Sequence, residues 1–198
     1  MPLFIKSQLR ETVKNARIEK AEKFLKNAAT SVQDSDRFDI FLSHSYKDAE
    51  EILGLKKNLE SFNYSVYVDW YTDSHLDRES VTKQTADQIR ERMRQCKCLF
   101  YVSSENAERS VWMPWELGYF DGLNRVERMN IDGKVAICPL VDQEIEEYQG
   151  QEYLGLYPYI SLAKLKDSAE LILWVNRAPE IYVPFNKWLQ GQQPYKHN

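Results

Sequence analysis

Short apolar runs alternate along the chain with longer stretches in which apolar residues recur every three or four positions. Four short runs are rich in β-branched and aromatic residues and predict strands, at Phe38–Ser43, Tyr64–Val68, Cys98–Val102 and Val135–Leu140. The stretches between them have the period of helices that bury one face. This alternation predicts an α/β fold, a parallel sheet with helices on both faces. The strands are continuous apolar runs, as buried parallel strands should be.

Two of the expected helices carry recognisable start signals. Ser45 and Asp48 have the spacing of a capping box, so a helix is expected to begin there. Thr82 is expected to cap the next helix, after a long polar loop from Asp69 to Val81. The apolar faces share a 3-4-3 spacing and comprise Ile52, Leu55, Leu59 and Phe62, then Ala86, Ile89, Met93 and Cys96. The outer face of the second helix is expected to be a solvated surface that carries Arg90, Arg92 and Arg94.

The third helix is expected from about Ser110 to Val126, and it contains two tryptophans and a glutamate. Pro114 is near its start, where a missing N–H is tolerated. Trp112 and Glu116 are four residues apart, so a helix places them on one face. A carboxylate beside an indole can contact a flat, polar ligand that carries a ring. The alternative is an amphipathic helix whose acid points outward, and the pattern alone leaves both open.

Both flanks of this alternating region are expected to be helical. Residues 1–34 predict an N-terminal amphipathic helix outside the main sheet, packed on the domain or on a second copy. Residues 35–198 form the second unit, with its core at residues 37–141. Tyr153–Ile160 can include a short last strand, although Pro158 leaves its limits uncertain. A C-terminal helical extension is expected from two segments, 168–177 and 184–191.

Composition narrows the classes of protein to which the chain can belong. The net charge of -4 predicts no general attraction to nucleic acid or to an anionic membrane surface. No apolar run approaches the ~20 residues of a membrane span, and no secretory signal is visible. Three cysteines suit a reduced, cytoplasmic location. Cys96 and Cys98 are interpreted as small apolar residues at a helix end and a strand start, and no metal site is expected.

Candidate chemistry gathers where the predicted strands end, because ligands of such folds bind beyond the carboxyl ends of the strands. The polar and aromatic residues expected there are Ser43, His44, Ser45, Asp69, Trp70, Asp73, His75, Asp77, Arg78, Ser103, Ser104, Trp112 and Glu116. This rim suits sugar hydroxyls and a heteroaromatic base. No glycine-rich phosphate loop is present in the first of these loops. His44 is a candidate general base, or it caps the strand end by hydrogen bonds.

Three segments resemble the motifs of one family, the TIR domains. The segment Phe38–Ser45, followed by Asp48, resembles the first strand and loop of a TIR domain. Tyr67–Trp70, with Leu76-Asp77-Arg78 and Val81-Thr82 after it, is similar to the second strand and BB loop of bacterial TIR proteins. Trp112–Glu116 fits the W-x-x-x-E pattern of the TIR helix that carries the catalytic glutamate. Together the motifs cover residues 37–141, and the chain is similar to the stand-alone TIR proteins of bacterial anti-phage systems such as Thoeris.

The resemblance implies a flavodoxin-like sheet and an activity on NAD+, which is the substrate and not a cofactor. Catalytic TIR domains cleave the bond between nicotinamide and ribose, and nicotinamide leaves as a neutral molecule. The enzyme must mainly stabilise an oxocarbenium-like ribose, as glycosidases do with a carboxylate. By resemblance, Glu116 is the catalytic acid, and the substrate-binding residues are Phe41, Ser43, His44, Trp70, Asp77, Arg78 and Trp112. Attack by water would yield ADP-ribose, and attack by an internal nucleophile would yield a cyclic product.

The resemblance also implies partners. TIR-like domains use the loop that corresponds to Asp69–Val81 to pair with a second copy. The sequence shows no obvious sensor or effector domain, so a small diffusible product is expected to act on a separate effector protein.

Two rival functions remain at this point. One is a non-catalytic TIR interaction module, against which the intact pair Trp112 and Glu116 argues. The other is a protein like the nucleoside deoxyribosyltransferases, which also place a glutamate at an anomeric carbon. The Ser43-His44 and Leu76-Asp77-Arg78 stretches argue against that second rival.

Overall fold

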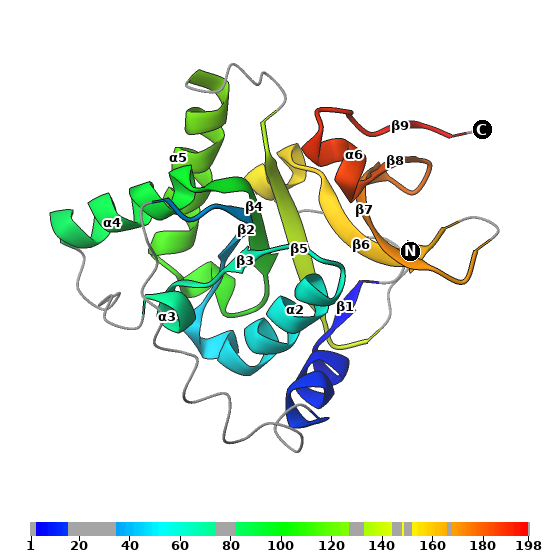
Figure 1. Cartoon of the computed structure of the whole chain (residues 1–198), viewed down its shortest axis with the longest axis horizontal. Coiled ribbons are helices and arrows are strands. Elements are labelled where there is room, and N and C mark those ends of the chain that lie inside the picture. The colour runs from blue at the N-terminus through cyan, green and yellow to red at the C-terminus, as the bar shows by residue number, and fades with distance from the viewer. Residues whose placement is uncertain are drawn as a thin grey trace.

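A single mixed sheet forms the centre of the protein (Figure 1). The computed structural model of the chain describes residues 3–15, 35–73, 82–126, 133–143, 148, 152–165 and 168–197. Within these residues the strand order is β3-β2-β4-β5-β6-β7-β8-β9, and β1 pairs with β5. Strands β3 (Val66–Tyr67), β2 (Phe38–Ser43), β4 (Cys96–Ser103) and β5 (Val135–Val141) are all parallel neighbours. The predicted α/β fold with a parallel sheet is therefore confirmed.

Helices cover both faces of this parallel half (Figure 1). One face carries α2 (Ala49–Ser61) and the short α6 (Phe185–Leu189), whose apolar side chains join Ile40 and Leu42 in one buried cluster. The other face carries α4 (Lys83–Arg94) and α5 (Trp112–Val126), which pack on Phe41 and Leu99. Neighbouring residues of β2 thus belong to opposite cores, because successive side chains of a strand point to opposite faces.

The two predicted helix starts behave differently. Thr82 caps α4 as expected, since its side chain accepts a hydrogen bond from the backbone N–H of Thr85 over 3.1 Å. Ser45 also caps, since its Oγ accepts a hydrogen bond from the backbone N–H of Lys47 over 3.4 Å, but Asp48 does not form the second half of the predicted capping box. A 3₁₀ turn, η1 (Tyr46–Asp48), precedes α2 instead, and the Asp48 carboxylate accepts hydrogen bonds from a loop after β4. The Asp48 carboxylate therefore binds residues distant in the chain instead of the backbone N–H at the start of the helix.

The N-terminal segment contributes to the sheet before it becomes helical. Strand β1 (Phe4–Ile5) pairs in parallel with the last residues of β5, in contrast to the expectation that this segment stays outside the sheet. Residues 6–15 are helical and bury Leu9 and Val13. The remainder of the predicted N-terminal helix lies outside the described residues.

The C-terminal extension is mainly antiparallel sheet, so the helix predicted at 168–177 is wrong. β6 (Tyr159–Lys164), β7 (Leu171–Ala178), β8 (Ile181–Pro184) and β9 (Tyr195–Lys196) follow one another as antiparallel neighbours. A short apolar run is compatible with a buried strand or a buried helix, and only its pairing with β6 decides between them. The second predicted helix is confirmed in shorter form as α6. After Tyr157-Pro158, β6 supplies the short strand expected near Ile160.

The segment expected as a polar loop begins with a helical turn, α3 (Asp69–Thr72). The assignment of Arg92 to a solvated surface is wrong, because its side chain is buried and its guanidinium binds the buried carboxylate of Asp73 at 2.7 and 3.2 Å. The hydroxyl of Tyr67 donates to the same carboxylate over 2.7 Å. No helix within the described ranges is long and apolar enough to cross a membrane.

Gly54 tests how closely the N-terminal helix is docked on α2. A Cβ at Gly54 would lie 2.9 Å from Cα of Leu9 and 2.7 Å from its carbonyl carbon, so an added methyl group must displace backbone. We expect Gly54→Ala to lower the free energy of unfolding by about 1–3 kcal/mol, as overpacking typically does, despite the higher helix propensity of alanine.

Gly118→Ala in α5 is the matched control, because nothing lies within 4 Å of its added Cβ. We expect this variant to be unchanged or up to about 1 kcal/mol more stable. Urea unfolding of both variants measures the difference, and equal stability of the two would contradict the close packing of Leu9 on Gly54.

Candidate active site

The carboxyl edge of the parallel sheet holds a hydrogen bond between a strand and the tryptophan-rich helix. Ser43 is the last residue of β2, and its Oγ donates to Oε2 of Glu116 in α5 over 2.6 Å. The side chains of both residues are fully buried. Ser43 and Tyr101 occupy paired positions on β2 and β4, so the helix places its carboxylate over two neighbouring strands. The predicted site residues Ser43 and Glu116 are thus brought together.

The position of Glu116 follows from the start of α5. The helix begins at Trp112 after the 3₁₀ turn η2 (Ala107–Arg109), and four residues later the same face presents Glu116. Glu116 is 0% exposed and Trp112 is 7% exposed, so this face is turned toward the sheet. The Trp112 ring packs edge-on against Trp115 at a centroid distance of 5.4 Å. The alternative in which the acid points outward is therefore excluded.

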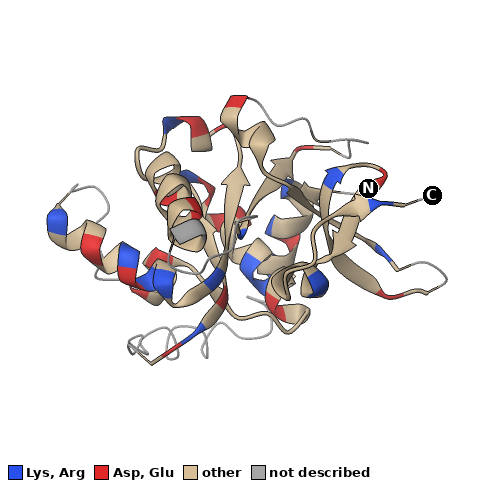
Figure 2. Ribbon diagram, turned by 90° about the horizontal axis from the view of Figure 1, so that it is seen from above, with Lys and Arg blue, Asp and Glu red and all other residues tan. Residues whose placement is uncertain are grey.

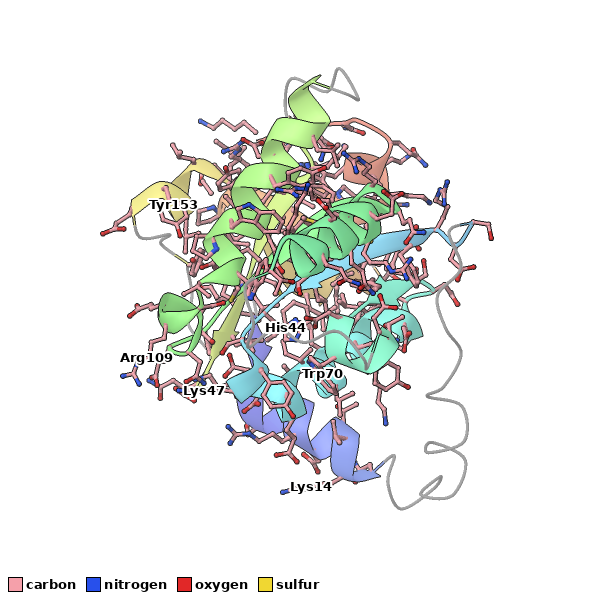
Figure 3. All side chains as sticks on the ribbon, turned by 90° about the vertical axis from the view of Figure 1, so that its left-hand side faces the viewer. Lys14, His44, Lys47, Trp70, Arg109 and Tyr153 are labelled. Atoms are coloured by element: carbon pink, nitrogen blue, oxygen red, sulfur yellow. The ribbon has the colours of Figure 1, made fainter. Side chains whose placement is uncertain are left out.

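His44 is held by two hydrogen bonds that fix which ring nitrogen carries the proton (Figure 3). Its Nδ1 lies 2.8 Å from the carbonyl oxygen of Leu42, which only accepts, so Nδ1 carries a hydrogen. The indole N–H of Trp70 donates to Nε2 of His44 over 2.6 Å, so Nε2 carries none. The ring is therefore neutral, with both nitrogens engaged.

A carboxylate also approaches this ring, since Oδ1 of Asp69 lies 3.4 Å from Nε2 of His44. The indole hydrogen bond is shorter and needs the lone pair of Nε2, so we assign the neutral ring. This arrangement supports the interpretation of His44 as a cap at the strand end more than as a general base, because the lone pair that would take a proton is already used.

Three other predicted substrate-binding residues are placed differently or not described. Phe41 is buried on the α4/α5 face of the sheet and stacks on Tyr67 at a centroid distance of 5.2 Å, so it packs beneath the edge. Asp77 and Arg78 lie outside the described residues. Their part in substrate binding stays a prediction.

A cleft of about 840 Å³ opens beside this edge, where β4 and β5 end. Three tyrosines line it, Tyr101, Tyr148 and Tyr153. Burial raises the pKa of Tyr101, and the neighbouring Tyr153 hydroxyl and the Glu116 carboxylate raise it further, so its hydroxyl stays protonated at neutral pH. Another cavity, of about 530 Å³, lies away from this edge beside the end of α2 and β7.

Comparison with known families agrees with this geometry. The family model described as "TIR domain" matches residues 40–173, which include most of β2, Glu116, and the strands β4 and β5 whose ends line the cleft. The chain belongs to the TIR domain family.

Two bacterial relatives extend this assignment. This TIR domain is 47% identical over 171 residues to "Probable 3' cyclic ADP-D-ribose synthase ThsB'" of Bacillus cereus (strain MSX-D12), covering 86% of this chain and 84% of the relative. It is 33% identical over 119 residues to "Putative cyclic ADP-D-ribose synthase TIR2" of Cytobacillus dafuensis. That match covers 60% of this chain but only 29% of the longer relative.

The tyrosines of the cleft are the site residues that sequence reasoning missed in this TIR domain. Tyr101 lies within an apolar strand, where it is indistinguishable from a core aromatic residue. Tyr148 and Tyr153 come from a stretch with no clear periodicity. The available signal was the position of Tyr101 two residues before the end of β4, on the same face as Ser103. Within the described residues, no group of His, Cys, Asp and Glu side chains is arranged to hold a metal ion.

The tautomer of His44 can be measured directly. We expect ¹⁵N chemical shifts to show a protonated Nδ1 and an unprotonated Nε2 for His44 in the folded protein, because Trp70 only donates. His197 serves as the internal control, since its Nε2 lies 3.0 Å from the carbonyl oxygen of Tyr182 and must carry the proton. A protonated Nε2 on His44 would show that the hydrogen bond from Trp70 does not form. His44 would then again be a candidate general base.

Proposed function

We propose that this protein cleaves the bond between nicotinamide and ribose in NAD+ and closes the remaining ADP-ribose into a ring. The observation that carries the proposal is Glu116, a fully buried carboxylate held by Ser43 at the carboxyl edge of the sheet. The names of the two relatives support the cyclic product class, and the relative that matches over 84% of its length is named for the 3′ cyclic isomer.

Charge development explains why one carboxylate suffices. As the C1–N bond breaks, its electron pair goes to nitrogen, the nicotinamide leaves neutral and the ribose acquires positive charge. A preoriented carboxylate in a dry site stabilises that charge more than bulk water would. A hydroxyl oxygen of the same molecule then bonds to C1 and releases its proton. Exclusion of water from the surroundings of Glu116 favours this internal attack over hydrolysis.

Ser43 preorganises the Glu116 carboxylate for stabilising positive charge on the ribose. The hydrogen bond from Ser43 holds Oε2 in one place, so less reorganisation is needed when charge develops on the substrate. Trp112, on the same helix face, would pack against the ribose or the base. Glu116 and Trp112 thus combine a carboxylate with an aromatic surface, which suits a sugar joined to a ring.

Assembly and signalling complete the proposal. We propose that copies of the chain associate through the Asp69–Val81 segment, and that the product acts in anti-phage defence on a separate effector protein. The buried contact between Asp73 and Arg92 supports the first step, because it holds the beginning of this segment rigidly on α4.

The role of Glu116 is tested by the nearly isosteric change Glu116→Gln. We expect NAD+ binding to persist while the rate of nicotinamide release falls by ~100–1,000-fold, as happens when one such electrostatic group is removed. Nicotinamide is measured by chromatography, NAD+ binding by calorimetry and folding by circular dichroism.

Glu91→Gln on the exposed face of α4 is the matched control, since Glu91 is exposed and pairs with Arg94 on the same helix. Its turnover should equal that of the wild type. If Glu116→Gln also turns over at the wild-type rate, the catalytic role is lost and the non-catalytic interaction module becomes the better hypothesis. Mass and NMR analysis of the product separates cyclic from linear ADP-ribose.

Association predicts a dependence of activity on protein concentration. If paired copies are the active form, nicotinamide release per mole of protein should rise with concentration until the dimer or larger assembly is saturated. Parallel measurement of mass by light scattering should show assembly over the same range. A constant specific activity with a monomeric mass throughout would contradict this part of the proposal.

A further inference from the structure

Two cations at the edge of the active site have no anionic partner among the described residues. Lys47 lies in η1, directly after β2, and Arg109 lies at the end of η2, three residues before Trp112. Both side chains are exposed, and neither forms an ion pair with any residue of the described ranges. In the view of Figure 3 both appear on the side of the molecule where His44 and Trp70 also lie.

A buried carboxylate fixes the two loops that carry these cations. Asp48 is 4% exposed and accepts hydrogen bonds from Oγ of Ser104 over 2.5 Å and from Nδ2 of Asn106 over 2.6 Å. Asp48 adjoins Lys47, and Asn106 is the residue before η2, which ends in Arg109. Charge-assisted hydrogen bonds of this length are among the stronger ones in proteins, so η1 and η2 are held together as one unit.

The cleft on one side of η2 is mainly acidic, whereas Lys47 and Arg109 on the other side are basic. The tyrosine-lined cleft has four carboxylates on its walls, those of Glu105, Glu108, Asp142 and Glu152, against one cation, Lys6, which is paired with Asp142. A phosphate group would be repelled there, although a neutral or cationic ring would be accepted. Figure 2 shows acidic and basic residues interspersed over the ribbon. In a chain with a net charge of -4, the pair Lys47 and Arg109 therefore offers positive charge at the edge where the substrate must lie.

An exposed aromatic ring adjoins this basic pair. Tyr46 is 73% exposed, and its ring meets Trp70 edge-on at a centroid distance of 6.1 Å. Trp70 in turn donates to His44, which follows Ser43 in the chain. The structure thus gives a continuous path along the edge, from the carboxylate of Glu116 through His44 and Trp70 to a free aromatic face and two cations.

We propose that Lys47 and Arg109 bind the diphosphate of the dinucleotide, that Tyr46 offers its face to the adenine, and that Asp48 is the positioning residue for both cations. The inference rests on the proposed function, since it extends the same site from the ribose toward the far end of NAD+. It also predicts that a substrate without the diphosphate is insensitive to the basic pair. A lysine and an arginine together supply both a point charge and a planar fork for phosphate oxygens.

The experiment compares ADP and adenosine as binding probes, so that no turnover is needed. We expect the wild type to bind ADP more tightly than adenosine, and the double variant Lys47→Ala/Arg109→Ala to bind ADP roughly 10-fold or more weakly, with adenosine unchanged. Raising the salt concentration should weaken ADP binding to the wild type more than to the variant. Lys97→Ala is the matched control, because Lys97 pairs with Asp39 near the opposite edge of the sheet.

Kinetics supply a second, independent readout. The double variant should raise the KM for NAD+ at nearly constant kcat, and it should leave cleavage of nicotinamide riboside unchanged. Asp48→Asn replaces an acceptor by a donor that faces Ser104 or Asn106, so it should raise the KM for NAD+ in the same way, whereas a general loss of folded enzyme would lower activity on both substrates.

The outcomes separate this inference from the proposed function. Equal ADP binding by the wild type and the double variant, or no preference of the wild type for ADP over adenosine, would overturn the diphosphate site even if NAD+ is cleaved. If ADP binding depends on the pair but the wild type releases no nicotinamide, the anion site stands and the proposed reaction falls.

Discussion

The hydrogen bond between Ser43 and Glu116 is the contact on which the arrangement of the carboxyl edge depends. A carboxylate removed from water costs several kcal/mol unless donors replace the lost hydration. Ser43 supplies one such donor from the end of β2, and it therefore joins this strand to the first turns of α5. Because Trp112 lies on the same helix face, this one contact also sets the position of the indole relative to the sheet.

Two other buried acids stabilise the loops around the site in a similar way. Asp48 joins the loop after β2 to the loop after β4. Asp73 joins the segment after β3 to α4 through Arg92, and it also accepts from Tyr67. Burial raises the pKa of Tyr67, and the neighbouring Asp73 raises it further, so the phenol remains a donor. The loops after β2, β3 and β4 are thus held by buried hydrogen bonds of Asp48 and Asp73, in addition to the strands and helices at their ends.

The C-terminal sheet extension also contributes to the site. The 3₁₀ turn η3 (Glu152–Leu156) brings Tyr153 to the cleft, and Arg177 of β7 donates to the carbonyl oxygen of Leu156 over 2.6 Å. The hydroxyl of Tyr157 lies 3.4 Å from a carboxylate oxygen of Asp121 in α5. The antiparallel strands thus do more than enlarge the sheet, because they hold one wall of the cleft against the helix that carries Glu116.

The sequence by itself determined the parallel half of the sheet and the helices on its faces, because continuous apolar strands and 3.6-residue periods are local signals. It also determined that Trp112 and Glu116 share a helix face, which follows from their spacing alone. Only the tertiary structure decided that this face points inward, that Arg92 is buried, and that the 168–177 segment is a strand. In each case a partner distant in the chain made the choice: Ser43 for Glu116, Asp73 for Arg92, and β6 for β7. The same reason explains why the sequence did not predict that Asp48 joins two loops or that Tyr101 lines a cleft, since these roles come from contacts across the carboxyl edge that no local pattern encodes.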